Sequence, residues 1–185
     1  MNRAYFSDTI EFFVKINPSE LLGKLVQKSD FALEQTQRDA WVEEIRILQK
    51  VLKPYKGSIY FEYTIPRMGK RIDVVVITGS TIFILEFKVG EKEFLSYAID
   101  QVWDYALDLK NFHETSHEHF IAPILIATKA ENTILEVSMT SHNDKIFCPI
   151  KCNSEMLGQV IIEVLKFSEG NTIDPIQWES GRYQP

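Results

Sequence analysis

Residues 59 to 88 read IYFEYTIPRMGKRIDVVVITGSTIFILEFK, and much of the architecture of the chain can be worked out from these residues. Three runs within them, 59–65, 71–77 and 81–88, are rich in aromatic and β-branched residues, which is typical of β-strands. Proline and glycine separate the first two runs, and Thr-Gly-Ser separates the last two, as in tight turns. Because short connections place consecutive strands side by side in opposite directions, the sequence predicts an antiparallel three-stranded meander.

Helical patterns lie on both sides of the meander. Over residues 34–52, Trp41, Ile45 and Leu48 recur at the spacing of one helix face, and Lys-Pro ends the pattern. Over residues 93–110 the apolar residues again recur at helical spacing and share one side. We therefore expect one helix before the meander and one after it.

A strand of a different kind is predicted after the second helix. Residues 121–127 are almost wholly apolar, as in a central parallel strand that is covered on both faces. A further strand over 145–150 and an amphipathic helix from an Asn153 cap to about Phe167 follow it. This order predicts an α/β fold in which helices flank a mixed sheet.

The chain is expected to hold one domain with an extension on each side. Its 185 residues correspond to a single domain, which we expect to span 34–167. Residues 1–33 are predicted to form a helical lead-in, with a helix start over 17–20 that Ser19 can cap. Residues 168–185 are rich in glycine, proline and polar residues and are predicted to be a linker.

Composition argues against a membrane protein. Apolar residues make up 45% and charged residues 25% of the chain, as in an ordinary globular domain. No apolar run approaches the roughly 18 residues needed to cross a bilayer. Asp8 and Glu11 interrupt the N-terminal segment, which is unlike a signal peptide. We therefore expect a soluble, cytoplasmic protein without a membrane partner.

The charge balance excludes one way of binding nucleic acid. Twenty Lys and Arg residues against 26 Asp and Glu residues give a net charge of −6. A protein that coats nucleic acid by charge alone would be basic. Contact with DNA or RNA would therefore need a local patch, or metal ions held by carboxylates.

Cysteine and histidine give no strong metal signal. The two cysteines, Cys148 and Cys152, are too few for a disulfide scaffold or a four-cysteine zinc site, and they are expected to fill the core. His113, His117 and His119 lie close together in the sequence but lack a nearby fourth ligand. A solvated loop is therefore favoured over a zinc site.

Charged residues interrupt two of the apolar runs of the meander. Asp73 lies at the head of the second run. Glu86 and Lys88 share one face near the end of the third run, with Phe87 on the other face. Because the start of one antiparallel strand lies opposite the end of the next, Asp73 is expected to face Glu86 and Lys88.

Two carboxylates and one ammonium group in a half-buried place are costly unless something compensates them. Mg²⁺ would compensate them, since it prefers one or two carboxylates together with waters and phosphate oxygens. The alternative is an ordinary surface salt bridge between Lys88 and either Asp73 or Glu86.

Gln101 and Tyr105 are four residues apart on the helix predicted over 93–110, so they share a face. That face is otherwise apolar, and a glutamine at its centre needs a polar partner. The two residues either face a functional site, or they are a backbone-bound glutamine and a core tyrosine.

Other charged residues are candidate site residues, and each also has an ordinary structural explanation. Glu44 falls within the apolar stripe of the helix over 34–52, whereas Glu43 points away. Glu44 therefore either contributes to a metal site or reaches solvent at the edge of the stripe. Glu62, in the first strand, is a weaker alternative to Glu44 as a metal-site candidate. Three basic residues near the first turn either hold a phosphate backbone or keep the turn soluble: Arg67, Lys70 and Arg71.

The spacing of Asp73, twelve residues, and then Glu86-x-Lys88 on adjacent strands resembles the PD-(D/E)xK, or restriction-endonuclease-like, nuclease superfamily. The common core of that superfamily is α-β-β-β-α-β, and the resemblance covers about residues 34–128. Ile72, rather than proline, precedes Asp73, at a position that varies in the superfamily.

A second motif is similar to the RecB-like branch of the same superfamily. That branch has a Gln-x-x-x-Tyr signature on the helix after the third strand, facing the metal site and the substrate. The segment Gln-Val-Trp-Asp-Tyr from Gln101 to Tyr105 has the same spacing.

The resemblance implies a nuclease that hydrolyses nucleic-acid phosphodiesters with Mg²⁺ or Mn²⁺. Lys88 would position the attacking water, and Gln101 and Tyr105 would line the site. The implied metal ligands are Asp73, Glu86 and the backbone carbonyl of Phe87, with Glu44 as a further candidate. The alternative is a catalytically silent module of the same fold that binds nucleic acid or a protein partner.

A closer resemblance spans nearly the whole chain. Four segments resemble the N-terminal region of a bacterial family that fuses such a domain to a Schlafen-group-three-like DNA/RNA helicase: 61–67, 71–73, 85–90 and 104–110. Residues 178–185 resemble the segment that leads into the ATPase of that family, although the chain has no G-x-x-x-x-G-K-[ST] loop. The resemblance implies a C-terminal helicase partner, a role in DNA processing or defence, and DNA rather than RNA as the favoured nucleic acid.

Overall fold

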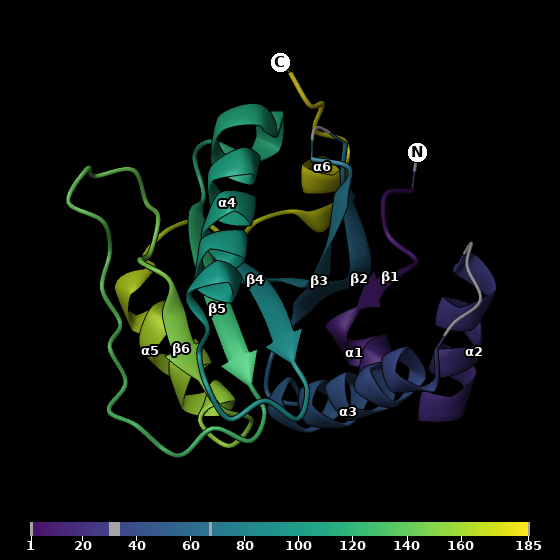
Figure 1. The fold of residues 1–185 in the computed structure, drawn as a ribbon. Helices are drawn as coiled ribbons and strands as arrows, with labels where there is room; N and C mark the ends of the chain where they lie inside the picture. Colours follow the sequence, from purple (N-terminus) through teal and green to yellow (C-terminus); the bar gives the residue numbers. More distant parts are fainter. Residues whose placement is uncertain (1, 30–33, 67, 185) are drawn as a thin grey trace.

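The computed structural model describes residues 2–29, 34–66 and 68–184 (Figure 1). Its strands are β1 (Phe6–Thr9), β2 (Gly57–Ile65), β3 (Lys70–Thr78), β4 (Thr81–Lys88), β5 (Phe120–Ala127) and β6 (Ile150–Cys152). Its α-helices are α1 (Ile10–Phe13), α2 (Pro18–Lys28), α3 (Gln35–Val51), α4 (Ser96–Phe112), α5 (Leu157–Phe167) and α6 (Pro175–Glu179). None of these helices is long and apolar enough to cross a membrane.

The strands form one mixed sheet in the order β1-β2-β3-β4-β5-β6. Strands β1 to β4 pair in antiparallel fashion, and β5 pairs in parallel with both β4 and β6. The predicted α/β class, the meander over 59–88 and the buried parallel strand over 121–127 are therefore confirmed. The elements α3, β2, β3, β4, α4 and β5 follow one another in the predicted order.

Helices cover both faces of the sheet because alternate strand residues point to opposite sides. In β4, Phe83 and Leu85 join the core layer beneath α1, α2, α3 and α5. Ile82 and Ile84 join the layer beneath α4 and α6. Figure 1 shows α4 packed over β4 and β5, so one of its faces is held against those strands.

The N-terminal segment is not purely helical, which corrects the predicted lead-in over 1–33. It begins with strand β1, which pairs with β2 so that Phe6 lies opposite Phe61. A strand of four residues is too short to show a clear period in the sequence. Helix α2 is capped by Asn17 rather than by Ser19, because the Asn17 side chain accepts the Ser19 N–H at 2.8 Å.

The C-terminal segment packs on the sheet, which corrects the linker predicted over 168–185. Trp178 of α6 is 1% exposed, and its Nε1 donates to Ser116 Oγ at 2.9 Å. The Ile173 N–H donates to the Gly79 carbonyl at 2.9 Å. The average composition of this segment is polar, but a few isolated apolar and aromatic residues anchor it.

Near the end of the domain the predicted strand is shifted along the chain. The sequence places it over 145–150, whereas β6 spans Ile150–Cys152, and Ile146 forms only an isolated bridge with Ile121. Pro149, which lacks an N–H, lies where a continuous ladder would need a donor. The Asn153 side chain accepts the Met156 N–H at 2.9 Å, as a helix cap does, just before α5 begins.

The histidines do not all lie in a solvated loop, which corrects another prediction. His113 is fully buried, with its Nδ1 atom 2.7 Å from Ser116 Oγ and its ring against Trp178. His117 is exposed and His119 is partly buried. Cys152 lies in the core as expected, whereas Cys148 is only partly buried.

Candidate active site

The candidate site lies where β3 and β4 separate. Their pairing runs as far as Val74 opposite Leu85, and the next residues along are Asp73 and Glu86. Asp73 Oδ2 accepts the backbone N–H of Phe87 at 2.9 Å. The side chain of Asp73 thus satisfies a donor just beyond the end of the ladder and is fixed beside Glu86.

Four acidic side chains gather around this fork. They come from four different elements, α3, β2, β3 and β4, and we call them the carboxylate cluster: Glu44, Glu62, Asp73 and Glu86. Glu44 and Glu86 are each only 4% exposed. So much negative charge in a dry place is unfavourable unless protons, cations or donors offset it.

The acidities in the carboxylate cluster reflect this crowding. Burial, followed by the charges of Asp73, Glu62 and Glu86, raises the pKa of Glu44 well above its usual value. Burial and the charge of Glu86 likewise raise the pKa of Asp73. Burial also raises the pKa of Glu86, although the ammonium group of Lys88 opposes that shift.

Two oxygens of the carboxylate cluster lack a hydrogen-bond partner among the residues that the structure describes. They are Glu44 Oε2 and Glu86 Oε2, and both are buried. A buried polar atom without a partner carries its full desolvation cost, which is larger for a charged group. A divalent cation would offset that cost at Glu86, and the donor set of Asp73 and Glu86 suits Mg²⁺.

The described residues contain no ready-made group of three or more His, Cys, Asp or Glu side chains placed to hold a metal ion. Mg²⁺ does not require one, because it usually keeps several waters and takes one or two protein carboxylates plus phosphate oxygens. Asp73 and Glu86 therefore fit a cation that binds together with a phosphate. They do not fit an ion, such as structural zinc, that is enclosed by four protein ligands.

A chain of polar contacts joins the carboxylate cluster to α4. Lys88 Nζ lies 3.2 Å from Glu86 Oε1 and donates to Gln101 Oε1 at 3.4 Å. Gln101 Nε2 in turn donates to Tyr105 Oη at 2.8 Å. The polar partners that Gln101 needs on its apolar helix face are thus Lys88 and Tyr105.

Lys88 and Tyr105 are both protonated near neutral pH. Burial lowers the pKa of Lys88, but the nearby carboxylates of Glu86 and Asp73 outweigh it and raise the pKa above the usual value. Burial and the charge of Glu86 raise the pKa of Tyr105 to about 12. Lys88 therefore offers a positive charge and hydrogen-bond donors, and Tyr105 offers a neutral hydroxyl.

Glu62 contributes more to the site than its sequence suggests. Its backbone lies in the left-handed region, with φ of 52°, which is unusual for a residue with a side chain. Trp41 Nε1 donates to its Oε1 at 3.0 Å, and Arg71 Nε donates to its Oε2 at 3.2 Å. Glu62 is therefore already satisfied by two donors, and its structural role is to tie α3 to the β2–β3 hairpin.

The backbone turn at Glu62 changes which face of the sheet the neighbouring residues occupy. Phe61 belongs to the core layer beneath α3, whereas Tyr63 belongs to the layer beneath α4. Residues two apart in a regular strand would share a face. No side-chain pattern in the sequence predicts the left-handed backbone at Glu62. The sequence shows there only an acidic residue between two aromatic ones.

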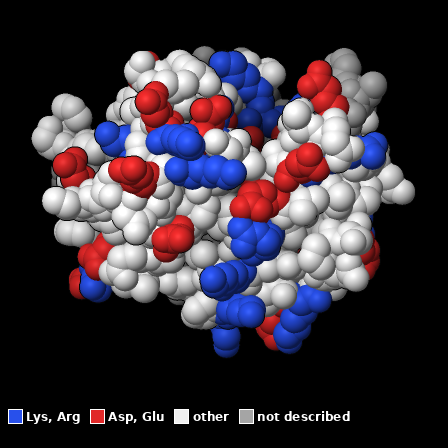
Figure 2. All heavy atoms as spheres, turned by 60° about the horizontal axis from the view of Figure 1, so that its bottom comes forward, with Lys and Arg blue, Asp and Glu red and all other residues white. Residues whose placement is uncertain are grey.

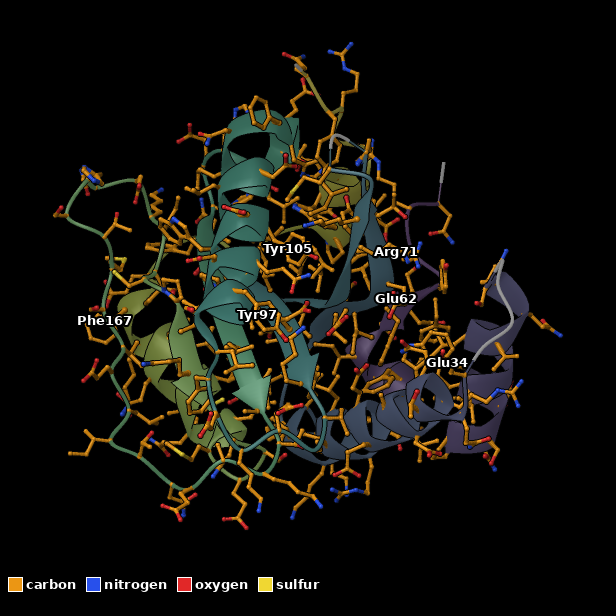
Figure 3. The ribbon with its side chains drawn as sticks, viewed as in Figure 1. Glu34, Glu62, Arg71, Tyr97, Tyr105 and Phe167 are labelled. Carbon is orange, nitrogen blue, oxygen red and sulfur yellow. The ribbon has the colours of Figure 1, made fainter. Side chains whose placement is uncertain are left out.

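The basic residues near the first turn are only partly assembled at the site. The Arg71 guanidinium lies 4.9 Å from the Tyr5 ring centroid in addition to its contact with Glu62. Lys70 is exposed, and Arg67 lies outside the described residues. Figure 3 shows Glu62 and Arg71 near one another on the hairpin and Tyr97 and Tyr105 on α4.

The molecular face at the bottom of Figure 1 carries mixed charge. Figure 2 shows Lys and Arg residues interleaved with Asp and Glu residues there, with wide uncharged areas between them.

No model of a known protein family matches the chain, and no curated protein matches it.

Proposed function

We propose that this chain is a metal-dependent nuclease domain of the restriction-endonuclease-like kind, which hydrolyses nucleic-acid phosphodiesters with Mg²⁺ or Mn²⁺. The observation that carries the proposal is the buried Oε2 atom of Glu86, which receives no hydrogen bond from any residue that the structure describes and lies beside Asp73, at the end of the Lys88–Gln101–Tyr105 chain. The order of α3, β2, β3, β4, α4 and β5, which corresponds to the α-β-β-β-α-β core, supports it. DNA as the favoured substrate and a helicase as the partner belong to the same proposal.

Asp73 and Glu86 would hold the cation, and the backbone carbonyl of Phe87 is the third proposed ligand. When bound, a divalent cation polarises a phosphodiester and lowers the pKa of a bound water. Asp73 is suited to this role because its bond to the Phe87 N–H fixes the position of its carboxylate. Glu44 is a further candidate ligand because one of its buried oxygens lacks a partner in the described structure.

Lys88 would orient the attacking water and offset the negative charge that develops in the transition state. It is not suited to accept a proton, because its carboxylate neighbours raise its pKa and keep it an ammonium group. Gln101 accepts from Lys88 and is itself bonded to Tyr105. These two residues would therefore act by holding the ammonium group in place.

The metal part of the proposal is tested by thermal unfolding. A cation that binds only the native state raises the melting temperature. We expect Mg²⁺ or Mn²⁺ to stabilise the wild type and to have little effect on Asp73→Ala. If Asp73→Ala and the wild type respond alike to the metal, the proposed site is wrong.

The catalytic part is tested with labelled single- and double-stranded DNA and RNA in Mg²⁺ or Mn²⁺. Lys88→Ala should keep the metal-induced stabilisation and lose cleavage by at least about a hundredfold, a typical loss for one preorganised charge. Lys92→Ala, which removes an exposed lysine a few residues away, is the matched control and should cleave normally.

Two outcomes of the cleavage assay would contradict the proposal. Equal cleavage by the wild type and Lys88→Ala would mean a different site or a contaminating nuclease. Tight nucleic-acid binding without cleavage by the wild type would favour the catalytically silent binding module.

A further inference from the structure

Tyr97 is a large aromatic side chain that is exposed to solvent beside Lys88 of the candidate site. It lies in the first turn of α4 and is 62% exposed. Tyr97, Gln101 and Tyr105 are spaced by four residues, so they follow one face of the helix. Along this face Tyr97 is exposed, Gln101 is half-buried and Tyr105 is buried, so the row leads from solvent to the polar chain at Glu86.

Lys88 connects the Tyr97 ring to the carboxylate cluster. Its Nζ atom lies 5.7 Å from the Tyr97 ring centroid and 3.2 Å from Glu86 Oε1. The ring and the carboxylate are thus both direct neighbours of one ammonium group. This is a cation–π contact to the ring, and Tyr97 as a whole residue is still 62% exposed, so much of its surface is open to a ligand.

We propose that Tyr97 is a stacking platform for an unpaired base of the nucleic acid, which makes single-stranded or frayed nucleic acid the preferred ligand of this site. The proposal rests on the proposed nuclease function and specifies its substrate class. A phosphate held at Asp73 and Glu86 would bring the base of the same or the adjacent nucleotide to the ring. Aromatic rings stack on any base, so the contact selects for unpaired over paired nucleic acid and not for a particular base sequence.

The ring selects unpaired bases because the faces of paired bases are already covered by their neighbours in the duplex. A ring beside the cleavage site can stack only on a base that is terminal, unpaired or turned out of the helix. A protein that bound duplex by charge alone would have no need of such a ring. The net charge of −6 agrees with a contact that depends on stacking as well as on phosphate binding.

The other role open to Tyr97 is to cover Lys88 from solvent, and suitable variants separate the two. Tyr97→Leu keeps an apolar group over Lys88 but cannot stack on a base, whereas Tyr97→Phe keeps the ring. Phe167→Ala is the matched control, since Phe167 is 50% exposed at the end of α5, which packs on the opposite face of the sheet from α4 (Figure 3, left).

The test is fluorescence anisotropy with labelled single-stranded DNA, single-stranded RNA and blunt duplex DNA in Ca²⁺, with thermal unfolding of every variant. We expect the wild type to bind single strands more tightly than duplex. Tyr97→Ala and Tyr97→Leu should lose roughly 5- to 150-fold in single-strand affinity, the usual range for one base stack. Tyr97→Phe should stay within about twofold of the wild type, because it keeps the stacking ring. Phe167→Ala should bind as the wild type does.

Several outcomes would overturn the stacking proposal. Wild-type affinity in Tyr97→Leu would mean that the ring only covers Lys88, and an equal loss in Phe167→Ala would mean that the effect is not local. Failure of the wild type to bind nucleic acid, or a preference for duplex, would also overturn it. Cleavage in Mg²⁺ is scored separately, so Tyr97-dependent binding without cleavage would refute the nuclease function and leave the stacking platform standing.

Discussion

Two buried polar clusters share the same sheet, and they differ in the kind of polar group they hold. One is the carboxylate cluster. The other, which we call the aromatic cluster, lies where the C-terminal segment packs on the sheet and consists of Tyr60, Tyr63, His113, Trp178 and Tyr183. The aromatic cluster buries neutral groups with large apolar surfaces, whereas the carboxylate cluster buries groups that are charged in water.

The difference shows what each cluster is suited to do. Burying a neutral hydroxyl or indole costs far less than burying a carboxylate, and the rings gain apolar contact in return. The aromatic cluster therefore stabilises the fold on its own. The carboxylate cluster has to be offset by protons, cations or hydrogen-bond donors, and the donors that the structure describes leave oxygens of Glu44 and Glu86 without a partner.

The largest expected effect comes from removing the centre of the aromatic cluster. Trp178→Ala should lower the free energy of unfolding by about 3–5 kcal/mol, as truncation of a buried aromatic residue typically does. Ile176→Ala is the control in the same helix, because Ile176 is 81% exposed, and it should stay within about 0.5 kcal/mol of the wild type. Denaturant unfolding measures both. Similar values for the two variants would show that α6 adds nothing to the core.

The aromatic cluster was also the region that the sequence predicted least well. The tail over 168–185 has the composition of a linker, and the apolar and aromatic residues that pack it on the sheet are isolated along the chain: Ile173, Trp178 and Tyr183. Isolated apolar residues give no period, so their burial cannot be read from a pattern. The burial of His113 is not visible in the sequence for the same reason, since it depends on Trp178 and Tyr183 of the tail.

The carboxylate cluster was more predictable because strand geometry constrains it. Antiparallel pairing alone brings Asp73 opposite Glu86, and helical spacing puts Gln101 beside Tyr105. What could not be predicted is the left-handed backbone at Glu62, since no side-chain pattern encodes it. The roles of these residues in metal binding and catalysis remain predictions.

The two clusters should respond to pH in opposite directions. Burial, followed by the charge of Arg3, lowers the pKa of His113 from 6.5 to about 4. A base with a lowered pKa in the folded state favours folding above its unfolded pKa and loses that contribution as the pH falls. We therefore expect the titration of His113 to lower the free energy of unfolding of the wild type by on the order of 2 kcal/mol as the pH falls from 6.5 to 4.

The measurement is the free energy of unfolding across that range for the wild type, His113→Gln and His117→Gln. The acid-dependent loss should shrink in His113→Gln and persist in His117→Gln, because His117 is exposed. An unchanged slope in His113→Gln would show that the buried imidazole does not make the aromatic cluster sensitive to acid.

The smallest effect is expected at Glu44, and its sign is the sharpest test of the comparison. The pKa of Glu44 is raised above its usual value of 4.5, so the folded state binds protons more tightly than the unfolded state. Its contribution to stability is therefore present below pH 4.5 and is lost as the pH rises toward the raised pKa. Glu44→Gln removes this penalty and should be on the order of 1 kcal/mol more stable than the wild type at pH 8. The gain should vanish toward pH 4.5.

The neighbouring Glu43 provides the control, because it has the same chemistry in the opposite setting. Glu43 pairs with Arg46 at 2.6 Å on the outer side of α3, and that hydrogen bond lowers its pKa. Glu43→Gln should therefore be slightly less stable at pH 8, by about 0.3 kcal/mol. If Glu44→Gln were destabilising at pH 8, Glu44 would have to be a charged and well-paired residue, and the contrast between the two clusters would fail.

If Mg²⁺ stabilises Glu44→Gln less than the wild type, the lost oxygen is a metal ligand. If Mg²⁺ stabilises both proteins equally, the cation is held by Asp73 and Glu86 without Glu44.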